Sequence, residues 1–304
     1  MSLTSTMFTG VSGLLNQAEG MSVIGNNIAN VNTIGFKGSR MLFSDVLSTT
    51  IGNVAVGQIG HGVQIQKVDT IFSQSSMETT TSPTDLFIQG KEFFAVAAPG
   101  TTANAAVPAT GAYYTRAGSF RVDNTGRNLI TPDNFNVLDS QSKPIVFTPT
   151  YTPPATVPPT VPPIVLDFQK VISVSTKGEM SLLYADSRGN SATVFYDGNG
   201  APPVLTVPTV FVGTANIPNP PGLVKVGGSL YRESGVVVGG SGTPVIGGPN
   251  GSTEQIISSN LELSNVDLAS EFVKMIQTQR AYSANSKTIT TSDEMMQEVL
   301  NIKR

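Results

Sequence analysis

The side chains that most often carry catalysis are scarce in this sequence of 304 residues. It has no Cys and a single His, His61, within the Gly-rich run 57–62. Without Cys there is no thiolate nucleophile and no cysteine-ligated metal, and one His leaves little for acid–base chemistry. The glycine spacing of 57–62 does not match a dinucleotide fingerprint, so this run is interpreted as a loop. We therefore expect no catalytic residue, no cofactor and no metal.

Acidic residues do not supply a site either. Asp123 and Asn124 precede Thr125 and Gly126 without the ligand spacing of a calcium loop, so they indicate a turn between strands. No nucleophile elbow, HExxH sequence or spaced carboxylate pair is present in the sequence. The sequence predicts a protein that is not an enzyme.

The charge and hydropathy of the sequence argue against nucleic acid and membranes as partners. Only 13% of the residues are charged, and the net charge is −3, so no basic surface is expected for nucleic acid. No apolar run reaches the length of a membrane span, which predicts no membrane insertion. No Lys or Arg occurs before Lys37, so no secretory signal peptide is expected.

The remaining signal is periodic and lies at the two ends of the chain. Residues 264–304 contain no Gly or Pro, although the chain has 30 Gly and 20 Pro. Apolar and polar residues recur there at steps of four and three, the 3.5-residue period of a coiled coil. We call the following set the C-terminal seam: Leu268, Phe272, Met275, Gln279, Tyr282, Ile289, Met296 and Leu300. Ser264 is predicted to cap this helix, with Asp267 three residues later. The alternative is a helix packed only on its own domain.

A second seam occupies the first thirty residues. Its members share the same spacing and form the N-terminal seam: Leu3, Met7, Val11, Leu14, Ala18, Met21 and Ile28. Four glycines within this segment are predicted to weaken the helix, each by up to about 1 kcal/mol relative to Ala. Such a helix requires a partner, so the two terminal segments are predicted to pair with each other and with neighbouring chains.

Two longer motifs resemble the ends of one known family. The residues after the N-terminal seam resemble the signature NNIAN-x-x-T-x-GFK of bacterial flagellar rod and hook proteins, and the matching positions are Asn26, Asn27, Ala29, Asn30, Thr33, Gly35, Phe36 and Lys37. The run from Leu261 is similar to the C-terminal end of that family, with Ser264, Asn265, Val266 and Asp267 as its signature residues.

The fold expected is a mainly β domain with terminal helices that pair as a coiled coil, α+β and elongated overall. The expected parts are an N-terminal coiled-coil helix (1–35), an extended connector (36–85), a β-rich domain (86–260) and a C-terminal coiled-coil helix (261–304). A proline-rich excursion, 148–163, is expected to be extended and to lie outside the sheets, because Pro donates no backbone hydrogen bond.

The resemblance implies a structural subunit that self-assembles into the helical tube of the flagellar hook. The segment between Asp45 and Gly62 looks shorter than in distal rod proteins, which favours hook over the alternative, a distal rod subunit of the basal body. A monomeric binding module is disfavoured because it would not explain two seams. The implied partners are further copies, the hook cap, distal rod and hook–filament junction proteins, and the export apparatus. The implied location is the extracellular flagellar hook or basal body, reached without a cleaved signal peptide.

Overall fold

The computed structural model describes residues 3–46, 48–50, 58–101, 106–108, 111–125, 127–153, 165–198, 208–235 and 240–302. They form two compact units. The first, here the helical unit, comprises Met1–Asn32, Lys37–Phe72 and Asn265–Arg304. The second, here the β body, comprises Thr33–Phe36 and Ser73–Ser264. The predicted α+β class, with paired terminal helices and a mainly β-strand body, is confirmed.

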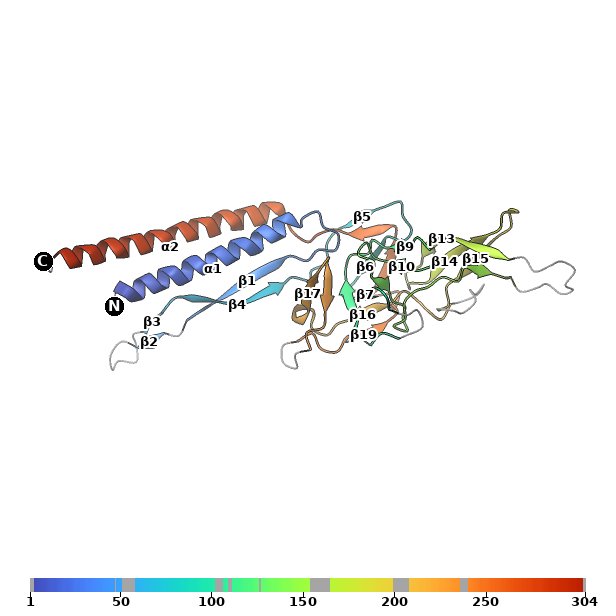
Figure 1. Ribbon diagram of the computed structural model, residues 1–304, viewed down its shortest axis with the longest axis horizontal. Coiled ribbons are helices and arrows are strands. Elements are labelled where there is room, and N and C mark those ends of the chain that lie inside the picture. The colour runs from blue at the N-terminus through green and yellow to red at the C-terminus, as the bar shows by residue number, and fades with distance from the viewer. Residues whose placement is uncertain are drawn as a thin grey trace, which may run out of the picture. The chain divides into compact units, whose positions relative to one another are not determined.

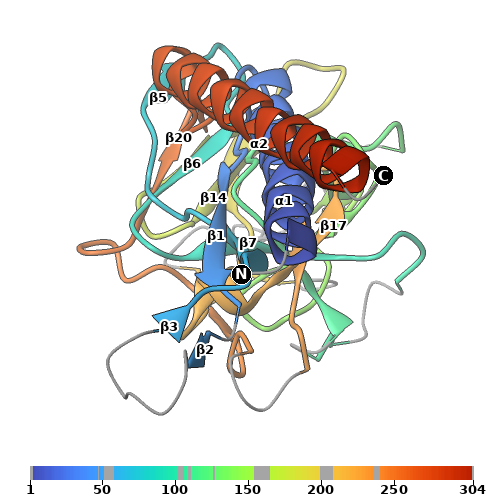
Figure 2. The same cartoon turned by 90° about the vertical axis from the view of Figure 1, so that its left-hand side faces the viewer.

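The helical unit is built on two helices from opposite ends of the sequence. Helix α1 (Leu3–Ala29) packs along α2 (Leu268–Ile302), as Figures 1 and 2 show. Strand β1 (Ser39–Asp45) pairs antiparallel with β4 (Val63–Thr70), and this ribbon packs on α1. A second short pair joins β2 (Thr49–Thr50) to β3 (Gln58–Ile59). Neither described helix is both long and apolar enough to span a membrane.

Glycines allow the close approach of the two helices. A Cβ added to Gly13 would lie 2.6 Å from Nδ2 of Asn285, and one added to Gly10 would lie 2.9 Å from Cγ1 of Ile289. A real Cβ contact is longer than either distance, so a larger residue would force the helices or these side chains apart. The glycines that weaken α1 in isolation therefore form its packing face in the folded chain.

The first turn of α2 is capped by a residue other than the one predicted. The carboxylate of Asp267 accepts hydrogen bonds from the backbone N–H of Ala269 and of Ser270, each at 3.2 Å. Ser264 lies too early in the chain for this role, and its carbonyl accepts a hydrogen bond from the Ser75 hydroxyl instead. The prediction of Ser264 as the cap was wrong, because the helix begins at Leu268 and Asp267 is its flanking residue.

The β body consists of short antiparallel strands in two larger sheets and two strand pairs. The first sheet runs β17-β18-β8-β7-β11-β10-β9, with β16 beside β7 and β19 beside β16. Its strands are β7 (Phe93–Ala97), β8 (Tyr113–Thr115), β9 (Arg121–Val122), β10 (Leu129–Ile130), β11 (Asn136–Val137), β16 (Thr214–Asn216), β17 (Val224–Gly227), β18 (Leu230–Arg232) and β19 (Val245–Gly247). A short 3-10 helix, Pro220–Gly222, precedes β17.

The second sheet has the order β12-β13-β14-β15. Its strands are β12 (Thr150–Tyr151), β13 (Leu166–Val174), β14 (Met180–Ala185) and β15 (Ser191–Phe195). The two remaining pairs join the C-terminal part of the body to its start: β20 with β6, and β21 with β5. These strands are β5 (Met77–Thr79), β6 (Leu86–Gln89), β20 (Gln255–Ser258) and β21 (Asn260–Glu262).

One hydrophobic core holds the sheets of the body together. The cluster includes Phe94 and Val137 from the first sheet, Leu182 and Tyr184 from the second, and Ile256 from β20. All five side chains are buried. Because both sheets share this core, the described residues 140–153 and 165–171 belong to the β body.

Part of the predicted proline-rich excursion lies in this core. Tyr151 is buried, pairs with Leu166 in the edge strand β12, and packs its ring 5.8 Å from that of Tyr184. The prediction that 148–163 as a whole lies outside the sheets was therefore wrong at its start, where an edge strand tolerates nearby prolines. Residues 154–163 of the tract lie outside the described residues.

Candidate assembly surface

Asparagine side chains fix the junction between the helices and the ribbon. Asn27, near the end of α1, donates to the Ser39 carbonyl at 2.7 Å and accepts from the Ser39 N–H at 2.9 Å. Asn265, just before α2, accepts from the Gly38 N–H at 2.8 Å and donates to the Ile71 carbonyl at 2.8 Å. These asparagines thus take the place of a strand partner for the backbone at the start of β1 and after β4.

A buried carboxylate completes the junction. Glu271, in the first turn of α2, accepts a hydrogen bond from Asn27 Nδ2 at 3.1 Å and forms an ion pair with Lys274. The Glu271 side chain is 8% exposed, whereas that of Lys274 is 52% exposed. A carboxylate near a helix N-terminus is also stabilised by the helix dipole. Glu271 was missed from the sequence because only its partners distinguish it from a surface glutamate.

A third asparagine ties the middle of α1 to the ribbon. Asn16 is buried and donates to the Val63 carbonyl at 2.6 Å. Asn16, Gly20 and Asn27 recur at steps of four and seven residues, so they share the face that Gly10 and Gly13 also occupy. Small and polar residues therefore make the internal face of α1.

This arrangement leaves large apolar residues of α1 uncovered. Phe8, Val11 and Leu15 are spaced by three and four residues and form an exposed stripe, with Phe8 74% exposed. The hydroxyl and amide groups on the opposite face already have partners inside the unit. An exposed Phe side chain does not stabilise the folded monomer, so this stripe is a candidate for contact with another chain.

The N-terminal seam lies between these two faces. Met7, Leu14, Met21 and Ile28 are half-buried, whereas Val11 and Ala18 are exposed. The side chain of Leu3 lies outside the described part of the structure. The seam residues are thus brought onto one side of α1, partly covered by the unit and partly open.

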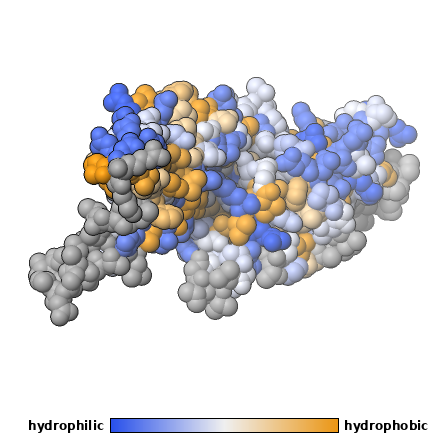
Figure 3. Space-filling view, turned by 60° about the vertical axis from the view of Figure 1, so that its left-hand side comes forward, coloured by the Kyte–Doolittle hydropathy of each residue, from blue (hydrophilic) through white to orange (hydrophobic). Residues whose placement is uncertain are grey.

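The C-terminal seam divides in the same way. Half of it is half-buried: Met275, Tyr282, Ile289 and Met296. The other half is exposed: Leu268, Phe272, Gln279 and Leu300. Further exposed apolar residues that sequence reasoning missed accompany it on α2, among them Val273, Ile276 and Val299. Hydrophobic residues gather on the surface of the helical unit in Figure 3.

The family-like N-terminal residues continue into the β body. Gly35 has a φ of +66°, and a Cβ there would lie 2.3 Å from the Ala117 nitrogen, so this position requires glycine. The ring of Phe36 is buried, and the Lys225 ammonium nitrogen lies over it, 4.9 Å from the ring centroid. Partial desolvation lowers the pKa of Lys225. Gly35 and Phe36 are therefore packed into the β body.

The other signature residues vary in exposure. Lys37 is buried, whereas Thr33 is half-buried; Asn26 and Ala29 are exposed, and Asn30 is half-buried. Of the C-terminal group, Ser264, Asn265 and Val266 are half-buried, and Asp267 is exposed.

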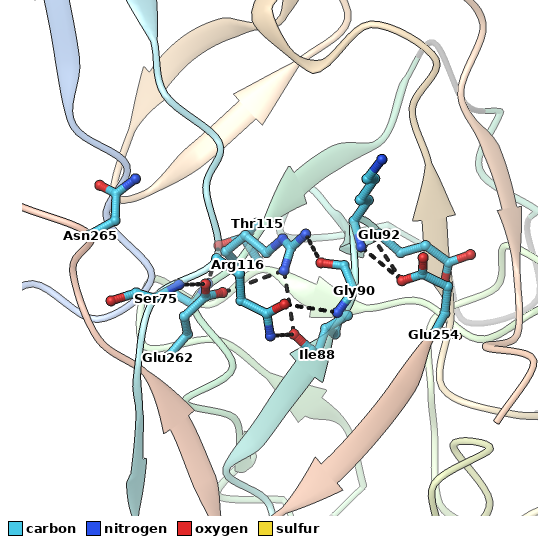
Figure 4. Close-up of polar contacts among 12 residues, drawn as sticks. Ser75, Ile88, Gly90, Glu92, Thr115, Arg116, Glu254, Glu262 and Asn265 are labelled. Carbon is cyan, nitrogen blue, oxygen red and sulfur yellow. Dashed lines mark hydrogen bonds and ion pairs between the residues drawn. The ribbon is translucent and has the colours of Figure 1, made fainter. Parts of the chain in front are cut away.

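A buried arginine organises the polar centre of the β body. Arg116 lies 3.5 Å from the Glu262 carboxylate and donates to the carbonyls of Ile88 and Gly90 (Figure 4). Its guanidinium also lies over the Phe93 ring. Burial lowers the pKa of Arg116, and the carboxylate of Glu262 opposes that shift. These contacts are internal to the body and include backbone carbonyls, so the cluster stabilises the body.

Both ends of the chain match models of known protein families. Residues 7–37 match the family described as "Flagella basal body rod protein", and residues 257–302 match "Flagellar basal body rod FlgEFG protein C-terminal". The chain is 36% identical to the flagellar basal-body rod protein FlgG of Bacillus subtilis in an alignment that covers 98% of this chain and 99% of that protein. The chain belongs to the flagellar rod and hook protein family.

Members of this family are structural subunits of the flagellum, which confirms the prediction of a protein that is not an enzyme. The FlgG rod protein of Borreliella burgdorferi is 32% identical over 98% of both chains. The hook protein FlgE of Treponema pallidum is 40% identical, but only over 139 residues, 28% of that protein.

These comparisons do not support the sequence-based preference for a hook protein. The alignment with the Bacillus subtilis rod protein covers almost all of both chains, so the segment between Asp45 and Gly62 is not evidence against a rod protein. The C-terminal family model covers rod and hook proteins together and does not distinguish them.

Proposed function

We propose that this chain is a subunit of the distal rod of the bacterial flagellar basal body, where copies assemble into a helical tube. The observation that carries the proposal is similarity along the whole chain to several rod proteins, from Bacillus, Borreliella and others. Local motifs at the two ends would fit any rod or hook protein, whereas agreement through the β body is more specific.

A hook subunit is the second candidate. It is favoured by the 40% identity to the Treponema pallidum hook protein, higher than the identity to any rod protein quoted above. That match, however, covers 42% of this chain and leaves most of the hook protein unmatched.

The proposed assembly surface comprises the two seams. Burial of their exposed apolar residues between copies would supply association energy of about 25 cal/mol per Å². The proposed partners are further copies, the neighbouring rod and hook proteins, the hook cap and hook–filament junction proteins, and the export apparatus. The proposed location is the flagellar basal body and hook region.

The test is deletion of the encoding gene in its own bacterium, followed by electron microscopy of isolated basal bodies. A structure built outwards stops at the first missing subunit. We expect basal bodies with a truncated rod and no hook, restored by the wild-type gene. Complete rods that lack only the hook would establish the hook assignment, and intact flagella would overturn both.

A further inference from the structure

The helical unit contains a groove that the packing of its own elements leaves open. It has a volume of about 450 Å³ and lies between α1, β1 and α2. Its floor is apolar and includes Val23, Ile24, Met41, Phe43 and Ile71. Phe43 and Ile71 are among the exposed large apolar residues of the chain. The lining also carries the polar side chains of Gln17, Ser39, Gln277 and Thr278, so the groove suits an amphipathic segment with an apolar stripe.

The rim of the groove is basic. Arg40 pairs with Asp69, and Lys274 pairs with Glu271, but in each pair the cation faces solvent. The Arg40 side chain is 59% exposed against 14% for Asp69, and Lys274 differs from Glu271 in the same direction. Glu271 also lines the groove but is largely buried, so an occupant meets two exposed cations beside the apolar floor, which favours an apolar segment flanked by carboxylates.

The chain itself carries such a segment at the far end of α2. Met295, Val299 and Ile302 are exposed and recur at steps of four and three, so they form one stripe. Glu294 and Glu298 are exposed beside it. We call residues 293–302 the α2 tip. Gly10 lies against Ile289, and α1 begins seven residues before Gly10, at Leu3. The start of α1 therefore lies opposite about residue 296 of α2, and no described residue of α1 covers the last turn of the tip.

The tip cannot reach the groove of its own chain. Lys274 on the rim and Val299 in the tip belong to the same helix, 25 residues apart, which is about 37 Å at 1.5 Å per residue. A single continuous helix cannot bring these positions together. Any contact between tip and groove therefore joins two copies, and it joins different surfaces of the two.

We propose that the α2 tip of one copy docks in the groove between α1, β1 and α2 of a second copy. Val299 and its stripe then lie on the apolar floor, with Glu294 and Glu298 near Arg40 and Lys274. Such a head-to-tail contact uses complementary rather than identical surfaces and repeats without closing, so it generates a filament. The inference rests on the proposed function and specifies which surfaces join copies along it.

Disulfide cross-linking of the full-length chain tests the contact directly, because the natural sequence has no Cys. Met41→Cys and Val299→Cys chains, carrying tags of different length, are mixed, polymerised and oxidised. We expect disulfide-linked heterodimers in the polymer and none in the dilute mixture. Ser283→Cys, at an exposed position in the middle of α2, replaces Val299→Cys in the matched control and should give few heterodimers.

Substitution in the tip provides a second readout. Val299→Asp should raise the concentration needed for polymerisation by about tenfold or more, since burying a Val side chain is worth at least one order of magnitude. Asn301→Asp adds the same charge off the stripe and should polymerise like the wild type. Circular dichroism of both monomers checks that each is folded.

The outcomes separate the two proposals. If the wild-type chain polymerises but heterodimers do not exceed the control and Val299→Asp polymerises normally, docking in the groove is overturned while the rod assignment stands. That result would also be expected if the groove holds a small apolar molecule. If the wild-type chain forms no polymer, the proposed function fails, and the docking inference fails with it.

Discussion

Asn27 and Asn265, from opposite ends of the sequence, accept hydrogen bonds from consecutive backbone amides. Asn27 Oδ1 lies 2.9 Å from the Ser39 nitrogen, and Asn265 Oδ1 lies 2.8 Å from the Gly38 nitrogen. The N-terminal and C-terminal family signatures thus meet at one point, where α1, α2 and the ribbon join. The two signatures belong to one structural junction.

Asn27→Ala should loosen this junction. It removes the hydrogen bonds from Asn27 to the Ser39 carbonyl and the Glu271 carboxylate and from the Ser39 N–H to Asn27, and each lost hydrogen bond costs about 1 kcal/mol. Hydrogen–deuterium exchange of the peptide that contains residues 38–42 should become faster. Asn26→Ala, at an exposed neighbour, is the control. Equal exchange in the two variants would show that the asparagine contacts contribute nothing.

Gly13→Leu should separate α1 from α2. Its side chain would occupy the space of Asn285, so the helical unit should lose helix content and resistance to protease. Gly25→Ala is the matched control, because a Cβ there meets nothing within 4 Å and removes a glycine from the helix. That control should gain up to about 1 kcal/mol of helix stability. Far-ultraviolet circular dichroism during thermal unfolding measures both, and equal melting temperatures would contradict the close-packing explanation.

Arg116→Met should destabilise the β body strongly. The Glu262 carboxylate would stay buried without its cation, and breaking a buried ion pair costs about 3–5 kcal/mol. Arg121→Met, which removes an exposed arginine from the same body, should cost less than about 1 kcal/mol. Urea denaturation followed by near-ultraviolet dichroism of tyrosine distinguishes them. A small, equal loss in both would show that the buried cluster is not a stabilising centre.

The β body should become more stable as the pH falls from 7 towards 5. Burial raises the pKa of Glu92, against a hydrogen bond from Thr214, and burial also raises the pKa of Asp139. A carboxyl with a raised pKa binds its proton more tightly in the folded state, so stability is present at low pH and lost as the pH rises through that pKa. The lowered pKa of Asp123 acts in the opposite sense, but only below about 4.

Glu92→Gln isolates the contribution of one carboxyl to this pH dependence. The variant should show a higher free energy of unfolding than the wild type at pH 7 and a smaller difference at pH 5. One proton accounts for at most about 1.4 kcal/mol per pH unit. Urea unfolding at the two pH values measures the slope, and an unchanged slope in the variant would exclude Glu92 as its source.

The sequence predicted the helices better than it predicted their contacts. The 3.5-residue period and the absence of Gly and Pro indicated the C-terminal helix, which the structure places at Leu268–Ile302. The glycines of α1 were interpreted as weak points because their effect on an isolated helix is local. Their role against Asn285 and Ile289 depends on a helix from the other end of the chain, which no local pattern describes.

The ribbon and the sheet order were beyond sequence reasoning for a related reason. β4 is largely exposed, and β1 alternates only between half-buried and exposed residues, so neither strand has the strong apolar alternation that predicts a strand on a core. β5 and β6 pair with β21 and β20, which lie far along the chain, and short strands carry too little side-chain pattern to select such partners. Tyr151 was predicted to lie outside the sheets because the neighbouring prolines indicate an extended segment, and a single aromatic residue is too weak a signal for a strand.

Electron microscopy of the purified full-length chain, concentrated until it polymerises, tests the central claim most directly. The measurement compares the wild type with Leu14→Asp, in the middle of the N-terminal seam, and Glu19→Lys, at an exposed position outside it. We predict straight tubes for the wild type and for Glu19→Lys. No tubes should form with Leu14→Asp, because a carboxylate would be buried at the interface without a partner. A wild-type chain that stays monomeric, or tubes that form equally well in all three, would contradict assembly through the terminal helices.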